Sequence, residues 1–545
     1  MNILQWDKTN SGVLTAITTR LIAVAMMLAS WLEFADAATS VSQFEFTWKF
    51  SQDRTVGQFA NGDWWVVGPV TITSITPADT NPNDGIDMHG TMVNPVHAAP
   101  NVKCVQGWDN RIIYNNYDPS LNIARSIPYV VANGSSIMSC ASQVATATGN
   151  LPQMETIGIL TVLASAPPVG SFRPPYIGTD KSIKWNMNQL DYTKLKNLTP
   201  VGTPPTFVEA EGQYEHTHIS LEDNWNGNYL LPINHDYPNY GREISHKIGR
   251  AALLLNLNYT NSQKETLLIR IVQRGIDICG ISNVGGGWQG NGGHLGGRKL
   301  PMMIAGHVLN DPTILARSNN YFAEDRQHFY VTQFDVDLPR HIADPTRQQD
   351  PYTTAMIGTP EWCSDHTTYP ADAGSNWNVY YRTVVGPANV GQALAARIMG
   401  LQTAWNWPSF FDYMDRFWTI EGIQNKNIST ATNSIHPFVA AMWNAYRGDS
   451  TVVQPPPPIS VNFAIGDRIS TSKITNVRDA GKLAGGLLDT QAVGALGTLV
   501  AGPIVSDSIT WWQVNYDLGV DGWSGQDNFI KLSPPSTPTG LKEVK

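Results

Sequence analysis

The spacing of apolar residues changes near residue 237, and this change limits the folds that the chain can adopt. Upstream of it, residues 44–50 alternate apolar and polar side chains with a period of two, which predicts a β-strand. Further apolar strand candidates upstream are 64–67, 70–73 and 157–163. Downstream, residues 243–257 and 265–281 carry apolar side chains at helical spacing. The sequence therefore predicts a β module followed by a helical module.

Apolar residues keep a helical spacing in several shorter stretches that are separated by loops. These stretches are 301–309, 390–401, 408–420 and 437–446. Serial helices of this kind can form a bundle, a solenoid or an (α/α) toroid. Long loops between helices favour the toroid, because its loops gather at one mouth. We therefore expect a β-sandwich over residues 39–175 and an all-α (α/α) toroid over residues 176–450.

Four consecutive prolines, 455–458, predict a stiff linker over residues 451–459 and a domain boundary. The segment that follows contains five short motifs in order: Gly-Asp-Arg-Ile from 466, Asn-Val-Arg from 476, Gly-Thr-Leu from 497, Trp-Trp-Gln-Val from 511 and Gly-Trp-Ser from 522. In order and spacing they resemble a bacterial SH3-like β-barrel. The resemblance implies an SH3-like domain over residues 460–535 that binds cell-wall peptide or glycan, or that packs on the catalytic domain.

The N-terminus resembles an export signal. Lys8 and Arg20 precede an apolar run, 21–31, and an Ala-Asp-Ala cleavage pattern ends at Ala37. We expect a signal peptide over residues 1–38, a secreted or periplasmic protein, and no stable membrane span after processing. In such a compartment Cys104 and Cys140 are expected to form a disulfide, and the apolar surroundings of Cys279 predict a buried thiol.

Charge and aromatic content indicate the class of partner. The formal net charge is −9, and the sequence shows no cluster of basic residues of the kind that binds nucleic acid. Eighteen tryptophans and nineteen tyrosines instead indicate aromatic recognition surfaces, as in proteins that bind glycans.

The segment 285–298 reads GGGWQGNGGHLGGR, and eight of its first thirteen residues are glycine. So many glycines cost backbone entropy on folding, which indicates tight turns or close approach to a ligand, with a flexible surface loop as the open alternative. The segment also contains an indole, two amides and an imidazole, the groups that a sugar site uses. The absence of a following Gly-Lys-Ser/Thr sequence argues against a phosphate cradle.

Three other segments concentrate polar and aromatic residues. In the first, His216 and His218 stand two apart near Glu222 and Asp223, a spacing that allows metal ligation, although lining a cleft is the simpler interpretation. The second, 235–242, contains Tyr240 and Arg242 and leads into a helix. The third, 377–382, reads WNVYYR and follows a polar run, which indicates a site wall or an aromatic packing patch.

Together these residue types indicate β-elimination at a uronic acid. That reaction needs hydrogen bonds that neutralise the carboxylate, and a base and an acid for the proton transfers. The supply of Asn, His, Tyr and Arg resembles that of (α/α)-toroid polysaccharide lyases such as the alginate and glucuronan lyases. The resemblance implies no metal or cofactor and an anionic polysaccharide substrate. The implied catalytic residues are Tyr381, His294, Asn291 and Arg382.

The resemblance also implies a set of substrate-binding residues around the catalytic ones. They are Trp288, Gln289, Arg298, Arg242, Tyr240, His218, Tyr380 and Trp377. Tyr380 and Tyr381 compete for the same role, and Tyr381 is preferred because it adjoins Arg382.

Two other functions stay open on the sequence alone. An inverting glycoside hydrolase on a toroid would need two carboxylates about 6.5–9.5 Å apart. The available acids are Glu215, Asp223, Glu361 and Asp365. A non-catalytic glycan-binding surface protein would use the aromatic residues for binding only.

Overall fold

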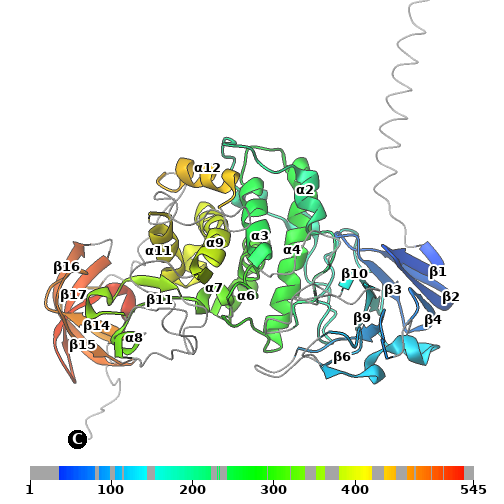
Figure 1. The fold of residues 1–545 in the computed structure, drawn as a ribbon, viewed down its shortest axis with the longest axis horizontal. Coiled ribbons are helices and arrows are strands. Elements are labelled where there is room, and N and C mark those ends of the chain that lie inside the picture. Colours follow the sequence, from blue (N-terminus) through cyan, green and yellow to red (C-terminus); the bar gives the residue numbers. More distant parts are fainter. Residues whose placement is uncertain are drawn as a thin grey trace, which may run out of the picture. The chain divides into compact units, whose positions relative to one another are not determined.

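A computed structural model shows two compact units, Met1–Pro455 and Pro456–Lys545 (Figure 1), so the division falls among the consecutive prolines. The residues that the structure describes are 36–79, 85–97, 105–112, 116–143, 154–221, 230, 232, 242–290, 292–319, 321–337, 352–362, 380–419, 435–449, 463–471, 474–492, 494–506 and 509–532. The predicted signal peptide lies almost entirely outside them. Within these residues, no helix has both the length and the apolar character needed to cross a membrane.

The first unit begins with one eight-stranded sheet, in which neighbouring strands follow the order β5-β9-β10-β3-β2-β4-β8, with β1 paired to β2. The strands are β1 (Asp36–Gln43), β2 (Phe46–Gln58), β3 (Trp64–Val67), β4 (Val70–Thr76), β5 (Thr91–Val93), β8 (Tyr129–Val131), β9 (Ser135–Ser142) and β10 (Met154–Leu163). β6 (Val105–Gln106) and β7 (Asn116–Tyr117) form a separate pair. The start of β2 alternates as predicted, with Phe46, Trp48 and Phe50 buried.

The helices of the first unit follow the sheet and differ widely in length. They are α2 (Phe207–Gly212), α3 (Arg242–Leu255), α4 (Asn261–Asn283), α5 (Lys299–Val308), α6 (Pro312–Leu315), α7 (Ala323–Arg326), α8 (Gln333–Asp337), α9 (Tyr380–Ile398), α10 (Gln402–Trp405), α11 (Pro408–Phe417) and α12 (Pro437–Tyr446). A short antiparallel pair of strands, β11 (His328–Tyr330) and β12 (Pro360–Trp362), interrupts them. Local chemistry explains the ends: Thr260 and Gln263 form a capping box at α4, and α11 and α12 each begin with proline.

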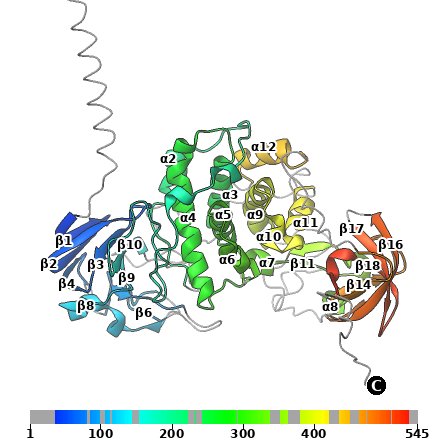
Figure 2. The ribbon, with the colours of Figure 1, turned by 180° about the vertical axis from the view of Figure 1, so that it is seen from behind.

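The predicted fold class is wrong. The residues that the structure describes form no clear central all-α toroid, and their large sheets include a nearly closed barrel and a half-barrel. In the part of the chain that is described, α3, α4 and α9 stand side by side (Figures 1 and 2), whereas α6, α7, α8 and α10 are only one turn or so long. The expected β-sandwich is likewise replaced by a single sheet path. Periodicity located the helices but did not encode how they pack.

Helices α3 and α9 pack in parallel, which fixes the geometry of the site described below. Arg242 of α3 contacts Val384 of α9, and seven residues further along each helix Gly249 contacts Gly391. A Cβ atom on Gly249 would lie 2.9 Å from the backbone of Gly391. Only glycine permits this approach, and the constant offset places both N-termini at the same end.

The second unit is a seven-stranded sheet in the order β15-β14-β18-β17-β16-β13-β19. Its strands are β13 (Arg468–Thr471), β14 (Thr475–Arg478), β15 (Leu487–Gln491), β16 (Leu496–Ser506), β17 (Ile509–Tyr516), β18 (Gly522–Gly525) and β19 (Phe529–Lys531). Ile469, Val477, Leu499, Trp512 and Val514 form its core. The five sequence motifs thus fall on neighbouring strands of one sheet.

Candidate functional site

The glycine-rich loop 285–298 is clamped by one short segment, 321–327. Three hydrogen bonds join them: the Trp288 amide to the Tyr321 carbonyl at 2.5 Å, the Gln327 side chain to the Gly292 carbonyl, and the Gly297 amide to Glu324 Oε1 at 2.6 Å. Just after the loop, Lys299 Nζ bonds Asp325 Oδ2 at 2.5 Å. These contacts run from the start of the loop to the first residue of α5. The loop is therefore a fixed part of the fold along most of its length.

The C-terminal end of the loop also lies against the first turns of α3. A Cβ atom on Gly296 would lie 2.6 Å from Ser245 Oγ, and one on Gly297 would lie 2.7 Å from the Ser245 amide nitrogen. Gly297 also has a φ of +83°, which side-chain-bearing residues rarely adopt. The glycines here allow the loop backbone to approach α3 closely, whereas the sequence indicated tight turns or close approach to a ligand.

His294 and Arg298 form the polar centre of the loop. Arg298 is buried, and its Nη1 donates to the carbonyls of His294 at 3.2 Å and Gly296 at 2.8 Å. Burial and, second, the Arg298 charge lower the pKa of His294 to about 4. The imidazole is therefore neutral near pH 7 and has a lone pair that can accept a proton.

Trp288 is a packing residue, which corrects its predicted role as a stacking platform for a sugar. It is fully buried, it stacks on Phe322 with ring centroids 5.2 Å apart, and its Nε1 donates to the Ser220 carbonyl at 3.1 Å. His218 is also buried, and its carbonyl accepts a hydrogen bond from Tyr176 Oη at 3.2 Å. Neither side chain is exposed to a polymer, whereas Gln289 is half-buried.

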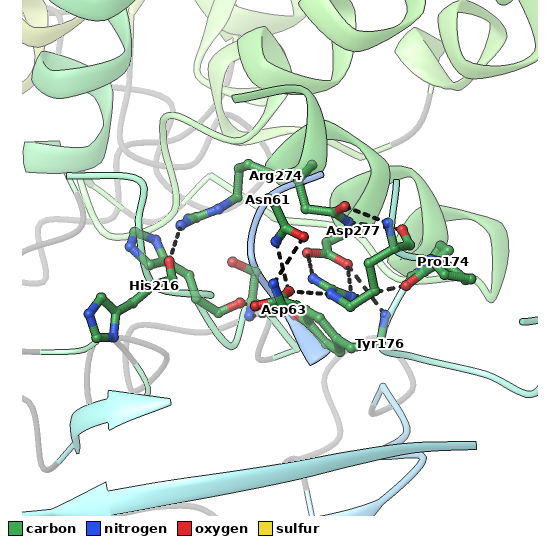
Figure 3. Close-up of polar contacts among 12 residues, drawn as sticks. Asn61, Asp63, Pro174, Tyr176, His216, Arg274 and Asp277 are labelled. Carbon is green, nitrogen blue, oxygen red and sulfur yellow. Dashed lines mark hydrogen bonds and ion pairs between the residues drawn. The ribbon is translucent and has the colours of Figure 1, made fainter. Parts of the chain in front are cut away.

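A buried ion network includes Asp63 and Asp277 and lies beside Tyr176 (Figure 3). The Arg173 side chain is fully buried; its Nε donates to Asp63 at 2.5 Å, and Nη1 and Nη2 donate to Asp277 at 2.9 and 2.6 Å. Asp63 precedes β3, whereas Asp277 lies in α4. One guanidinium therefore joins the sheet to the longest helix that the structure describes.

The network continues towards the loop through Tyr176. The Tyr176 amide donates to Asp277 at 3.3 Å, and its hydroxyl accepts from the Ser220 amide at 3.1 Å. The Ser220 carbonyl in turn accepts from Trp288 at the start of the loop. A continuous chain of hydrogen bonds thus connects Arg173 to the glycine-rich loop.

The first turn of α9 reaches the same end of the molecule as the first turn of α3. Arg242 Nη1 donates to the Val384 carbonyl at 3.5 Å, and Arg242 also forms an ion pair with Glu243 at 2.7 Å. Tyr380, Tyr381 and Arg382 belong to this turn of α9, although their side chains lie outside the described part. The structure therefore brings the loop, Arg242 and the backbone of 380–382 to one end of the helical pair.

The other predicted residues of the site lie outside the described residues. They are Asn291, Tyr240 and Trp377, together with Asp223 and Asp365 of the hydrolase alternative. The roles of these residues stay predictions.

The remaining acids and imidazoles of the alternatives have structural partners. His216 stacks on Phe44 with centroids 3.6 Å apart and contacts Thr156 Oγ1 at 2.6 Å. Glu215 pairs with Arg270 at 3.4 Å, and the buried Glu361 pairs with Arg416. Among the described residues, no group of three or more His, Cys, Asp or Glu side chains could hold a metal ion.

The sequence analysis missed the segment that holds the loop. Glu324 and Asp325 are buried, and burial raises the pKa of each. His328 Nδ1 faces the Glu324 carbonyl, an acceptor, so Nδ1 carries the proton of the neutral ring. Two adjacent acids usually indicate a solvated turn, so nothing in the sequence of this short segment marked Glu324 and Asp325 as buried.

Both cysteines in the described residues are free and buried. Cys279 is the buried thiol that was predicted. The expected disulfide of Cys140 is not formed: the Cys140 thiol contacts Ser142 Oγ at 3.5 Å, and Cys104 lies outside the described residues.

Comparison of the chain with protein-family models, with curated proteins and with solved structures gives no match.

Proposed function

We propose that the protein cleaves a uronic-acid-containing polysaccharide, with alginate as the first candidate, by β-elimination that uses no metal or cofactor. The observation that carries the proposal is the meeting of three segments at one end of the parallel helices α3 and α9: the glycine-rich loop, Arg242 and the first turn of α9. Each helix N-terminus is equivalent to roughly half a positive charge. Two of them beside arginines favour an anionic ligand such as a uronate carboxyl.

The proposed proton transfers use His294 and Tyr381. Because its pKa is lowered to about 4, His294 is neutral at the pH of the reaction and can share the removal of the C5 proton. Tyr381 serves as the acid that protonates the leaving oxygen and also as a base. A tyrosine needs a nearby cation to ionise near neutral pH, and Arg382 and the N-terminus of α9 are the cationic groups that its position offers.

Neutralisation of the substrate carboxyl is assigned to Asn291 and Arg382. Hydrogen bonds from an amide and a guanidinium stabilise the charge that develops as the C5 proton leaves. Arg242, Gln289, Tyr240, Tyr380 and Trp377 stay proposed binding residues. Arg298 supports this set from within the loop, since its Nη1 is already bonded to loop carbonyls.

The test is activity on a panel of polyuronates. A lyase releases an unsaturated product that absorbs in the near ultraviolet. Tyr381→Phe is expected to abolish turnover and to leave polymer binding nearly intact, and His294→Ala is expected to reduce turnover steeply. Tyr446→Phe is the matched control, because it also removes one hydroxyl, in that case from a bond to the Thr199 carbonyl at 2.6 Å.

Other outcomes would replace the proposal. New reducing ends without the chromophore would indicate a hydrolase, especially if Glu215→Gln or Asp365→Asn abolished them. An intact polymer that still binds would indicate a non-catalytic binding protein. Loss of activity in a chelator would indicate that His216 and His218 hold a metal.

A further inference from the structure

Glu324 is the buried acid that touches the glycine-rich loop directly. The residue belongs to α7 and is 1% exposed. Its Oε1 accepts a hydrogen bond from the Gly297 amide, with 2.6 Å between nitrogen and oxygen. Among the residues that the structure describes, Oε2 has no hydrogen-bond partner. Burial of a half-satisfied carboxyl is costly, so its surroundings must compensate it.

The compensation comes from the residues next to Gly297. Burial raises the pKa of Glu324, whereas hydrogen bonds from its own backbone amide and from the Gly297 amide, and then the charges of Arg298 and Lys299, lower it. Lys299 is held mainly by Asp325, which leaves Arg298 as the cation adjacent to the Gly297 bond. Arg298 in turn holds the His294 carbonyl and influences the His294 imidazole by its charge. Glu324, Gly297, Arg298 and His294 therefore form one connected unit.

Gly297 is the point at which this unit meets α3. A side chain at position 297 would clash with Ile244 and Ser245 of α3. The amide of Gly297 is bonded to Glu324 of α7. If the Glu324 bond is lost, the loop loses the contact that presses Gly297 against α3. Displacement of a reacting group by about 1 Å can reduce turnover by roughly 100-fold.

We propose that Glu324 is a positioning residue of the active site: by accepting the Gly297 amide proton it sets the orientation of His294 and Arg298 relative to α3. The inference rests on the proposed lyase function for its kinetic consequence. The clamp itself is a property of the fold and can be measured without substrate.

Two variants separate hydrogen bonding from simple loss of a buried group. Glu324→Gln keeps an acceptor oxygen for the Gly297 amide, whereas Glu324→Leu has a similar size and no acceptor. Asp109→Leu is the matched control, because it removes a carboxyl that is equally buried and that pairs with Arg111 at 2.6 Å, outside the loop. All variants are made in the full chain.

Hydrogen exchange of peptides covering 285–299 tests the clamp. Glu324→Leu is expected to speed exchange in this loop, with Glu324→Gln and Asp109→Leu close to the wild type. Unchanged loop exchange in Glu324→Leu would overturn the clamp. If Glu324→Leu does not fold, Glu324→Gln decides the question, because it keeps an acceptor for the Gly297 amide. Faster exchange in its loop, with exchange elsewhere at the wild-type rate, would then overturn the clamp.

Turnover of the polyuronate that the wild type cleaves tests the positioning role. We expect kcat of Glu324→Leu to fall by roughly 100-fold with little change in KM, and Glu324→Gln to restore most of it. A wild-type kcat in Glu324→Leu would overturn the positioning role. If the wild type itself cleaves no polyuronate, the proposed function fails, while loop exchange still decides whether Glu324 holds the loop.

Discussion

Replacement of Arg173 by methionine should destabilise the first unit strongly, because it removes the only cation that contacts two buried carboxylates in the described network. Arg173 makes one bond to Asp63 and two to Asp277, and a further bond at 2.9 Å to the Pro174 carbonyl. Methionine fills part of the volume and leaves both acids without this partner. Breaking a buried ion pair in this way costs about 3–5 kcal/mol.

The two acids should not contribute equally to this cost. Asp63 keeps donors from Gln43 Nε2 at 2.8 Å and Asn61 Nδ2 at 2.7 Å, whereas the bond that Asp277 keeps is the Tyr176 amide at 3.3 Å. Asp277 is therefore the acid that Arg173 stabilises most. Adding Asp277→Asn to the methionine variant should recover more stability than adding Asp63→Asn.

Urea unfolding followed by tryptophan fluorescence measures these differences, with the transition of the first unit fitted separately. Lys184→Ala is the control: it breaks the exposed pair with Asp180, which should contribute no more than about 1 kcal/mol. The reasoning is refuted if Arg173→Met stays within about 0.5 kcal/mol of the wild type, the range of ordinary surface substitutions. Equal recovery by the two second-site changes would refute the ranking of the acids.

Three further predictions concern single groups. Gly297→Ala should displace the loop and destabilise the first unit by about 1–3 kcal/mol, because it combines a positive φ with a backbone clash, and loop exchange would detect this. Lys181 donates to three carbonyls, and burial lowers its pKa to about 7, so the folded state binds its proton less tightly than the unfolded state. Its contribution to stability should therefore rise between pH 7 and about 10.5. Urea titrations of Lys181→Met should not show that rise. Burial lowers the pKa of His307 to about 4, so stability should fall as the pH drops from about 6.5 to 4, and His307→Leu should show a smaller fall by the same titration.

The helices were predictable from sequence because their signals are local. The expected 437–446 helix agrees with α12, and the 265–281 helix lies within α4, whose start is explained by the Thr260 capping box. The packing of these helices was not predictable in this way, and the toroid expected from the sequence was wrong. The parallel packing of α3 on α9 depends on contact between Gly249 and Gly391, which are 142 positions apart, and periodicity carries no information about such pairs.

Burial of individual polar and aromatic residues was the weakest part of the sequence analysis. Trp288 stands among glycines and polar residues, yet Phe322 and Ser220 bury it from distant segments. Glu324 belongs to a residue type that is usually exposed, yet it is buried and accepts the Gly297 amide proton. The glycine cluster was visible in the sequence, but its contact partner was not, because Gly296 and Gly297 lie against Ile244 and Ser245 of a distant segment.

The shared guanidinium of Arg173 also limits how this chain can be divided or recombined. A fragment that starts after residue 175 would keep Asp277 in α4 and lose its counter-charge, and a fragment that ends there would expose Asp63 and Arg173 without the helix. The sheet and the helices of the first unit should therefore be inherited and expressed together. A cut among the prolines at 455–458 follows the boundary between the two compact units, and exchange of the C-terminal seven-stranded sheet between proteins should be tolerated there.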